Sequence, residues 1–297
     1  GEAERIATAV TRLGIPVYLS GMARGLLGRE HPLQMRHARR NALRESDCVI
    51  LAGVPCDFRL DYGRHIRRGA TFIAANRSAR DARMNRRPTI AAIGDAGLFL
   101  ERLATRSIDG AKWRDWVQSL RKRDLEREAE IDAQAQGQGE FVNPVGFFRA
   151  LDRAAADNAI MVADGGDFVA TASYIVHARS PLSWLDPGVF GTLGVGAGFA
   201  LGAAAARPKG EVWIIYGDGA CGYGLVEFDT FVRHRIAVIA VVGNDAGWTQ
   251  IAREQVKMLK DDVGTVLART DYHRVAEGFG AAGILVTKNA EVPAALE

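Results

Sequence analysis

The sequence has few features of a disulfide-stabilised, zinc-binding or membrane-spanning protein. Its 297 residues include only three cysteines, Cys48, Cys56 and Cys221, which form neither a CxxC site nor a paired framework. Its six histidines show no metal-binding spacing such as HExxH. It has no signal peptide at its start, and no apolar run reaches the roughly 18 residues that span a bilayer. We therefore predict a reducing, cytoplasmic location and no membrane insertion by this segment.

The charge distribution also argues against a nucleic-acid-binding surface. The net charge is +3, with 48% hydrophobic and 25% charged residues, which is ordinary for an α/β protein. Arginines and lysines concentrate at residues 36–44, 77–87 and 121–123, but no aromatic residues are interleaved with them. Such runs are more often solvated helix faces than nucleic-acid-binding patches.

Strand and helix patterns alternate along the chain and predict an α/β fold with two doubly wound, parallel-sheet domains. Residues 1–107 are predicted to form a Rossmann-like domain. Residues 108–140 are charged and weakly periodic and end in a Gln/Gly stretch, which is typical of a helical domain linker. Residues 141–297 are predicted to form the second domain. Both ends of the sequence fall within helical patterns, so we expect it to be part of a longer polypeptide.

Individual elements follow from apolar runs and their spacing. In the first domain the patterns predict strands at 16–19, 48–53 and 71–77 and helices at 31–46 and 94–106. In the second domain they predict strands at 159–164, 211–217, 236–243 and 283–287, helices at 144–156, 199–207 and 220–234, and a long helical stretch after residue 243.

Polar residues follow two neighbouring strands of the second domain. Asp218, between Gly217 and Gly219, follows one apolar strand, and Asn244 and Asp245 follow the next. About 16 residues separate the two strands, enough for one crossover helix of a parallel βαβ unit. The carboxyl ends of such strands face one ligand crevice, so these side chains should converge.

Convergent oxygen ligands of this kind suit Mg²⁺, which commonly shares its coordination shell with phosphate oxygens. The glycines beside Asp218 allow close backbone approach to a bulky anion, and a helix predicted to begin near Ala220 would direct free N–H groups at it. A Gly-Asp-Gly sequence alone is weak, because many tight turns contain one. Its combination with an Asn 26 residues later, after the next strand, is more specific and favours a magnesium diphosphate site.

The segment GDGACGYGLVEFDTFVRHRIAVIAVVGNDAGWTQIAREQ (217–255) resembles the thiamine diphosphate (ThDP) motif of acetolactate synthase-like enzymes, including 2-hydroxyacyl-CoA lyases. The glycine-rich segment LDPGVFGTLGVGAGFALGAAAARP (185–208) is similar to the segment that precedes this motif in the family. Residues 1–107 resemble the family's central domain, to which we assign a structural role. The resemblance implies ThDP and Mg²⁺ as cofactors.

The resemblance also implies roles for individual residues. The metal ligands would come from Asp218, the carbonyl of Gly247, and Asn244 or Asp245. Spacing in relatives favours Asp245 slightly, whereas repulsion between Asp245 and diphosphate favours Asn244. The cofactor-binding set comprises Gly191, Leu193, Gly217, Asp218, Gly219, Ala220, Asn244, Asp245 and Gly247.

Leu193 would hold the cofactor bent, which places its 4′-amino group beside the thiazolium C2 proton; the alternative is an ordinary core leucine. Trp248 and Gln250 are candidates for the substrate pocket, although Trp248 is equally consistent with core packing. The sequence Asp164-Gly165-Gly166-Asp167 either lines the site or forms a plain turn. Cys221 is predicted to be a small buried residue with no nucleophilic role.

The glutamate that activates ThDP in this family belongs to an N-terminal domain outside this sequence, and Glu227 is predicted to pair locally instead. The chain alone should therefore be inactive, and the resemblance implies a homodimer or homotetramer formed through that domain. The favoured activity is cleavage of a 2-hydroxyacyl-CoA to an aldehyde and formyl-CoA. The alternatives are acetolactate synthase-like chemistry on 2-oxo acids and a non-catalytic α/β binding module.

Overall fold

The computed structural model describes residues 1–106 and 109–297, which divide into two compact units. The first contains residues 1–19 and 30–127, and the second contains residues 20–29 and 128–297. Helix α4 (Arg114–Ala135) therefore contributes to both units. The expected domain boundary at residues 107 and 108 lies outside the described residues.

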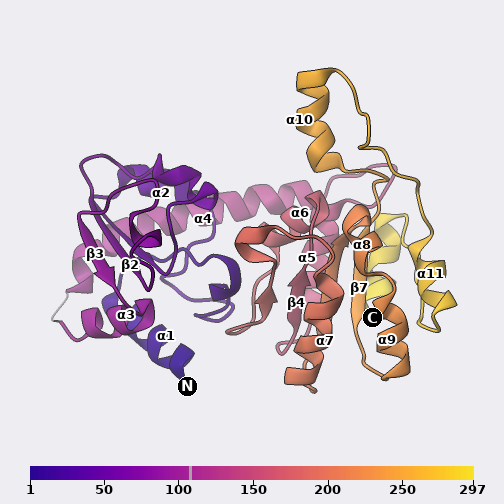
Figure 1. Cartoon of the computed structure of the whole chain (residues 1–297), viewed down its shortest axis with the longest axis horizontal. Helices are drawn as coiled ribbons and strands as arrows, with labels where there is room; N and C mark the ends of the chain where they lie inside the picture. The colour runs from indigo at the N-terminus through magenta and orange to yellow at the C-terminus, as the bar shows by residue number, and fades with distance from the viewer. Residues whose placement is uncertain (107–108) are drawn as a thin grey trace. The chain divides into compact units, whose positions relative to one another are not determined.

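A parallel sheet in the order β1-β2-β3 forms the centre of the first unit (Figure 1). Its buried apolar residues include Val49 and Leu51 of β1 and Phe72 and Ala74 of β2. The strands are β1 (Cys48–Ala52), β2 (Thr71–Asn76) and β3 (Ile90–Ile93), and the helices that precede α4 are α1 (Glu2–Leu13), α2 (Arg39–Glu45) and α3 (Ala96–Ala104).

Three details of the first unit differ from the sequence prediction. The strand expected at 16–19 is reduced to a single bridge between Val17 and Gln34. Residues 32 and 33 form a turn before this bridge, so the helix expected at 31–46 is limited to α2, which begins after Ala38 in a left-handed conformation. Strand β3 was not predicted, because its four residues make too short an apolar run to be recognised alone.

The second unit contains a parallel sheet in the order β5-β4-β6-β7, which confirms the predicted α/β class with two parallel-sheet domains (Figure 1). Its strands are β4 (Ile160–Ala163), β5 (Trp184–Leu185), β6 (Val212–Gly217) and β7 (Ile239–Gly243). Its helices are α5 (Pro144–Ala154), α6 (Asp167–Ile175), α7 (Gly196–Ala206), α8 (Asp218–Gly224), α9 (Glu227–Arg233), α10 (Thr249–Leu259), α11 (Tyr272–Gly278) and α12 (Val292–Leu296).

Along β4 and β6, apolar side chains point alternately to the two faces of the sheet, and helices cover both faces. Met161 and Trp213 pack with α5 and α6 in one core cluster, whereas Val162 and Ile214 pack with α7 in the other. Successive strand residues point to opposite faces, so a strand that is apolar at every position is buried on both sides. All of β4 and β6 is buried accordingly.

The second unit also corrects several predicted elements. The helix expected at 220–234 is two helices, α8 and α9, and α8 ends at Gly224, a residue type that weakens a helix. Residues 283–287, all of them described, form no strand; Ile284 and Leu285 are exposed and lack a pairing strand. The long helical stretch expected after residue 243 consists of separate short helices, and α6 and β5 were not predicted.

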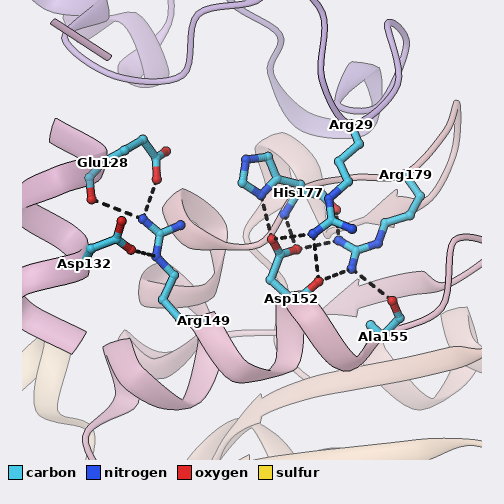
Figure 2. Close-up of polar contacts among 8 residues, drawn as sticks. All are labelled: Arg29, Glu128, Asp132, Arg149, Asp152, Ala155, His177 and Arg179. Carbon is cyan, nitrogen blue, oxygen red and sulfur yellow. Dashed lines mark hydrogen bonds and ion pairs between the residues drawn. The ribbon is translucent and has the colours of Figure 1, made fainter. Parts of the chain in front are cut away.

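A network of charged groups around Asp152 of α5 joins separate segments of the second unit (Figure 2). The Asp152 carboxylate accepts hydrogen bonds from Arg179 Nη1, from His177 N at 2.9 Å and from Arg29 Nη2 at 3.3 Å. Burial alone would raise the pKa of Asp152, but hydrogen bonds from His177 and Arg179 outweigh it and hold the pKa well below its usual range. The network ties Arg29 and residues 177–179 to α5.

Within residues 1–106 and 109–297, helices are too short or too polar to cross a bilayer.

Candidate functional site

The strand register brings the predicted oxygen ligands together at one edge of the second sheet. Gly217 of β6 pairs with Gly243 of β7, so Asp218 and Asn244 occupy the next position on adjacent parallel strands. Gly247 N donates a hydrogen bond to Asp218 Oδ2 at 3.1 Å, which links the loop after β7 to the residue that follows β6. The convergence predicted from the sequence is therefore present.

Asp218 is a buried carboxylate held by neutral donors. It is 2% exposed, and its Oδ1 accepts a hydrogen bond from its neighbour Gly219 N at 2.7 Å. Burial raises the pKa of Asp218, and the nearby charge of Asp245 raises it further. The Tyr272 hydroxyl donates to the backbone carbonyl of Asp218 at 3.0 Å and fixes the turn. A carboxylate in this environment gains most from a bound cation.

Asn244 and Asp245 differ in a way that bears on the choice of metal ligand. Asn244 Nδ2 donates to the carbonyl of Thr270 at 2.9 Å, which fixes the orientation of the amide. Its Oδ1 is buried and has no hydrogen-bond partner among the described residues. Buried polar atoms are rarely left without a partner, so this oxygen suits a ligand. The Asp245 side chain is exposed. The geometry thus favours Asn244 over Asp245, against the slight preference drawn from spacing, and the assignment stays a prediction.

Glycines allow the chain to come unusually close to itself around this turn. A Cβ atom on Gly217 would lie 2.8 Å from the carbonyl oxygen of Gly165, and one on Gly219 would lie 2.5 Å from the Trp248 ring. Gly217 N also donates to the Gly165 carbonyl at 2.8 Å. The ends of β4 and β6 are therefore in direct backbone contact. The predicted turn around Asp218 is accordingly built on close backbone approach.

Leu193 lies beside the same turn. Its Cδ2 is 2.1 Å from the position that a Cβ of Gly165 would take, and Ala220 Cβ is 3.9 Å from that position. The side chain is half-buried and packs on the core cluster of β4, β6 and α7. Gly191 is exposed and has a φ of 58°, in the left-handed region that favours glycine. Leu193 and Ala220, predicted from separate motifs, thus lie together, while the roles of both stay predictions.

Trp248 and Gln250 follow the metal-ligand loop and differ in their packing. Trp248 is half-buried against Gly219, and its ring centroid lies 6.3 Å from that of Tyr223. Gln250 is exposed on the first turn of α10. Trp248 thus covers the turn that contains Asp218, whereas the Gln250 side chain is open to solvent. Their place in a substrate pocket stays a prediction.

Cys221 and Glu227, which the sequence analysis excluded from catalysis, have the surroundings predicted for them. Cys221 is fully buried, and burial raises the pKa of its thiol to about 12, so the reactive thiolate is disfavoured. Glu227 Oε2 accepts a hydrogen bond from Thr230 Oγ1 at 2.8 Å, the local pairing that was predicted. Sequence reasoning did not identify Tyr272 or Thr270, because they lie far along the chain and share no motif with Asp218.

The site fits a metal-bound diphosphate by the chemistry of its donors. The described residues hold no group of three or more His, Cys, Asp or Glu side chains arranged around a metal. A cation here would therefore depend on the Asp218 carboxylate, the unpartnered Asn244 amide oxygen and backbone carbonyl oxygen. Such a mixed oxygen set, completed by phosphate oxygens and water, is typical of Mg²⁺.

Comparison with known proteins identifies the family. Residues 1–103 match the model of the thiamine pyrophosphate enzyme central domain, and residues 164–297 match the model of the C-terminal TPP-binding domain. Thiamine pyrophosphate is another name for ThDP. The chain belongs to the thiamine pyrophosphate enzymes and contains these two domains.

Particular relatives are similar over nearly the whole chain. The chain is 50% identical to 2-hydroxyacyl-CoA lyase 2 of Mus musculus over 293 residues, which are 97% of this chain and 46% of the relative. It is 50% identical to 2-hydroxyacyl-CoA lyase 2 of Caenorhabditis elegans, over 94% of this chain and 45% of the relative. Identity to the acetolactate synthase large subunit of Mycobacterium tuberculosis is 35%, over 95% of this chain and 52% of that protein. The chain thus spans about half the length of the curated relatives it matches.

Proposed function

We propose that the complete protein is a ThDP- and Mg²⁺-dependent lyase that cleaves a 2-hydroxyacyl-CoA to an aldehyde and formyl-CoA. The main support is the 50% identity to 2-hydroxyacyl-CoA lyase 2, compared with 35% to an acetolactate synthase subunit. In this reaction the bond between the carbinol carbon and the thioester carbonyl carbon breaks. The hydroxyl proton is lost as the aldehyde forms, and the thioester carbon gains a proton to become formyl-CoA. Atoms and charge therefore balance without another reactant.

The residues of this chain would bind and orient the cofactor. Asp218 and Asn244 would hold Mg²⁺ through side-chain oxygens, with the Gly247 carbonyl as the third protein ligand. The Ala220 N–H group would donate to the diphosphate, and the backbone of Gly191 and Leu193 would donate to and accept from the aminopyrimidine ring. When bound, ThDP supplies the carbanion and electron sink that cleavage next to a carbonyl requires.

Leu193 and Trp248 would act through steric contacts. Leu193, which lies over Gly165 beside Ala220, would support the bent cofactor from below. Trp248 covers the Asp218 turn and would limit water access to the diphosphate end of the site. The residue that activates the cofactor would come from an N-terminal domain, through which the protein would form a homodimer or homotetramer. We also propose a cytoplasmic location, because the three cysteines form no paired framework.

An assay of the complete protein tests the proposal. With ThDP and Mg²⁺ present, the protein is given a 2-hydroxyacyl-CoA in one reaction and pyruvate in another, and products are separated by mass. We expect aldehyde and formyl-CoA from the first and no acetolactate from the second. Acetolactate from pyruvate without formyl-CoA would replace the proposal with the acetolactate synthase alternative. Asp218→Ala serves as the control, because it removes a proposed metal ligand and should abolish either activity.

A further inference from the structure

A buried carboxylate outside the predicted metal set contacts the glycine-rich segment. Asp164 directly follows β4 and is 4% exposed. Its Oδ1 accepts a hydrogen bond from Gly194 N at 2.9 Å, and its Oδ2 accepts one from Gly196 N at 2.6 Å. Gly196 is the first residue of α7, and the N-cap residue Val195 has an apolar side chain that cannot accept a hydrogen bond. From its position at the end of β4, Asp164 thus accepts a hydrogen bond from a first-turn N–H group of α7. Its charge lies at the positive end of the helix dipole.

The glycines of this segment make the contact possible. A Cβ on Gly196 would lie 2.8 Å from Asp164 Oδ2 and 2.9 Å from Tyr216 Cε1. Gly194 has a φ of 83°, and a Cβ there would lie 2.5 Å from Tyr223 Cβ. Both sides of the contact therefore leave no room for a side chain. The segment has little freedom to shift while Asp164 holds it.

Leu193 is the residue directly before Gly194, and its side chain is fixed at the same strand end. Leu193 Cδ2 occupies the space that a Cβ of Gly165 would need, 2.1 Å away, and Gly165 directly follows Asp164. Asp164 therefore holds the backbone on the C-terminal side of Leu193, while Gly165 provides the space for its side chain. Two consecutive residues after β4 therefore contact this leucine or the backbone that follows it.

We propose that Asp164 is a positioning residue, which holds the N–H groups of Gly194 and Gly196 and thereby sets the place of the Leu193 side chain under the cofactor. The inference rests on the proposed function, in which Leu193 keeps ThDP bent. Asp164 acts through the backbone of the glycine-rich segment and donates no group to the reaction. If Asp164 were simply a helix cap, its loss would lower stability and leave the bound cofactor unchanged.

Two variants break this contact from opposite sides. Asp164→Asn keeps the size of the side chain but turns one acceptor oxygen into an N–H donor that faces a backbone N–H. Gly196→Ala keeps the carboxylate and inserts a methyl group 2.8 Å from it. Gly202→Ala is the matched control, since it adds the same methyl to α7 where no described atom outside the adjacent helix backbone lies within 4 Å. Asp152→Asn is a second control, which weakens a buried carboxylate network elsewhere in the same unit.

The measurements use the complete protein with ThDP and Mg²⁺. Isothermal titration calorimetry gives the affinity for ThDP, and NMR at saturating ThDP gives the rate at which the C2 proton of the bound cofactor exchanges with deuterium. We expect Asp164→Asn and Gly196→Ala to bind ThDP about tenfold to a hundredfold more weakly, as for loss of a charge-assisted hydrogen bond. We expect C2 exchange to slow by about tenfold or more, because the two rings are no longer held in register. Gly202→Ala should match wild type, and Asp152→Asn should lower Tm without slowing C2 exchange.

Wild-type exchange rates in both Asp164→Asn and Gly196→Ala would overturn the positioning role. Should neither variant fold, amide hydrogen exchange of the wild-type protein decides the matter. Positioning by Asp164 requires the Gly194 and Gly196 amides to be protected before ThDP is added, and rapid exchange at both would overturn it. A wild-type protein that binds no ThDP would instead refute the proposed function, so the two failures are distinguishable.

Discussion

Asp152 and Asp218 are both buried carboxylates of the second unit, at 5% and 2% exposure, but their surroundings differ in sign. Asp152 is bound by the guanidinium groups of Arg179 and Arg29, and its pKa is low (Figure 2). Asp218 accepts hydrogen bonds from backbone N–H groups beside a second carboxylate, and burial raises its pKa. The first charge is neutralised by the protein itself, which is what a structural ion pair requires. The second gains from an external cation, which is what a metal ligand requires.

Removal of the Asp152 charge should have the largest effect on the free energy of unfolding. In Asp152→Asn the Arg179 side chain, which is 2% exposed, loses its counter-charge. We expect a loss of about 3–5 kcal/mol, measured by urea denaturation, because one partner of a buried pair remains charged. Asp229→Asn breaks an exposed pair with Arg233 and, as the control, should change stability by less than about 1 kcal/mol. Unchanged stability of Asp152→Asn would contradict a structural role.

Asp218→Asn should show the reverse pattern, with a large effect on ligand affinity and little on the fold. We expect the complete protein to bind ThDP and Mg²⁺ at least about a hundredfold more weakly, equivalent to about 3 kcal/mol. Thermal stability without cofactor should fall much less than in Asp152→Asn, since Asn loses one backbone hydrogen bond but leaves no buried partner with an unpaired charge. Calorimetric titration and thermal denaturation measure the two quantities. If Asp218→Asn destabilised the cofactor-free protein as much as Asp152→Asn, the contrast between the two sites would be lost.

Lowering the pH should reduce the stability of the fold by protonating Asp152. Because the pKa of Asp152 is lowered by folding, its ionised form stabilises the fold above the unfolded-state pKa of about 3.9. This stabilisation is lost as the pH falls through the lower folded-state pKa, with a slope of up to about 1.4 kcal/mol per pH unit. Denaturation curves recorded at decreasing pH should therefore show a steeper loss in wild type than in Asp152→Asn. Parallel curves would show that Asp152 contributes nothing to acid sensitivity.

The smallest expected effect separates the two neighbours of Asp218. Asn244→Ala removes the buried amide oxygen that lacks a partner and should weaken binding of ThDP and Mg²⁺ by about tenfold, or about 1.4 kcal/mol. Asp245→Ala removes an exposed side chain and should change the affinity by less than about threefold. The same titration compares both. A larger loss in Asp245→Ala than in Asn244→Ala would restore the choice based on spacing.

The sequence predicted β4, β6 and β7, and the polar residues that follow β6 and β7, because these are local patterns. The fully apolar runs that became β4 and β6, and the Gly-Asp-Gly turn after β6, can be recognised without knowledge of what packs on them. Elements that depend on a distant partner were missed. The pairing of Val17 with Gln34 shortened an expected helix, and the exposed Leu285 lies in an expected strand that has no neighbour. A short apolar run is consistent with several structures until its contacts are known.

By itself, the sequence determined that Asp218 and Asn244 follow adjacent parallel strands, since hydrophobic runs and crossover length specify that order. Only the tertiary structure decided that Asp152 pairs with arginine side chains, whereas Asp218 accepts hydrogen bonds from backbone N–H groups. It also decided that Asp164 holds Gly194 and Gly196, 30 and 32 residues away. Strand order follows from local periodicity, whereas the partner of a buried charge depends on which segments folding brings within hydrogen-bond distance.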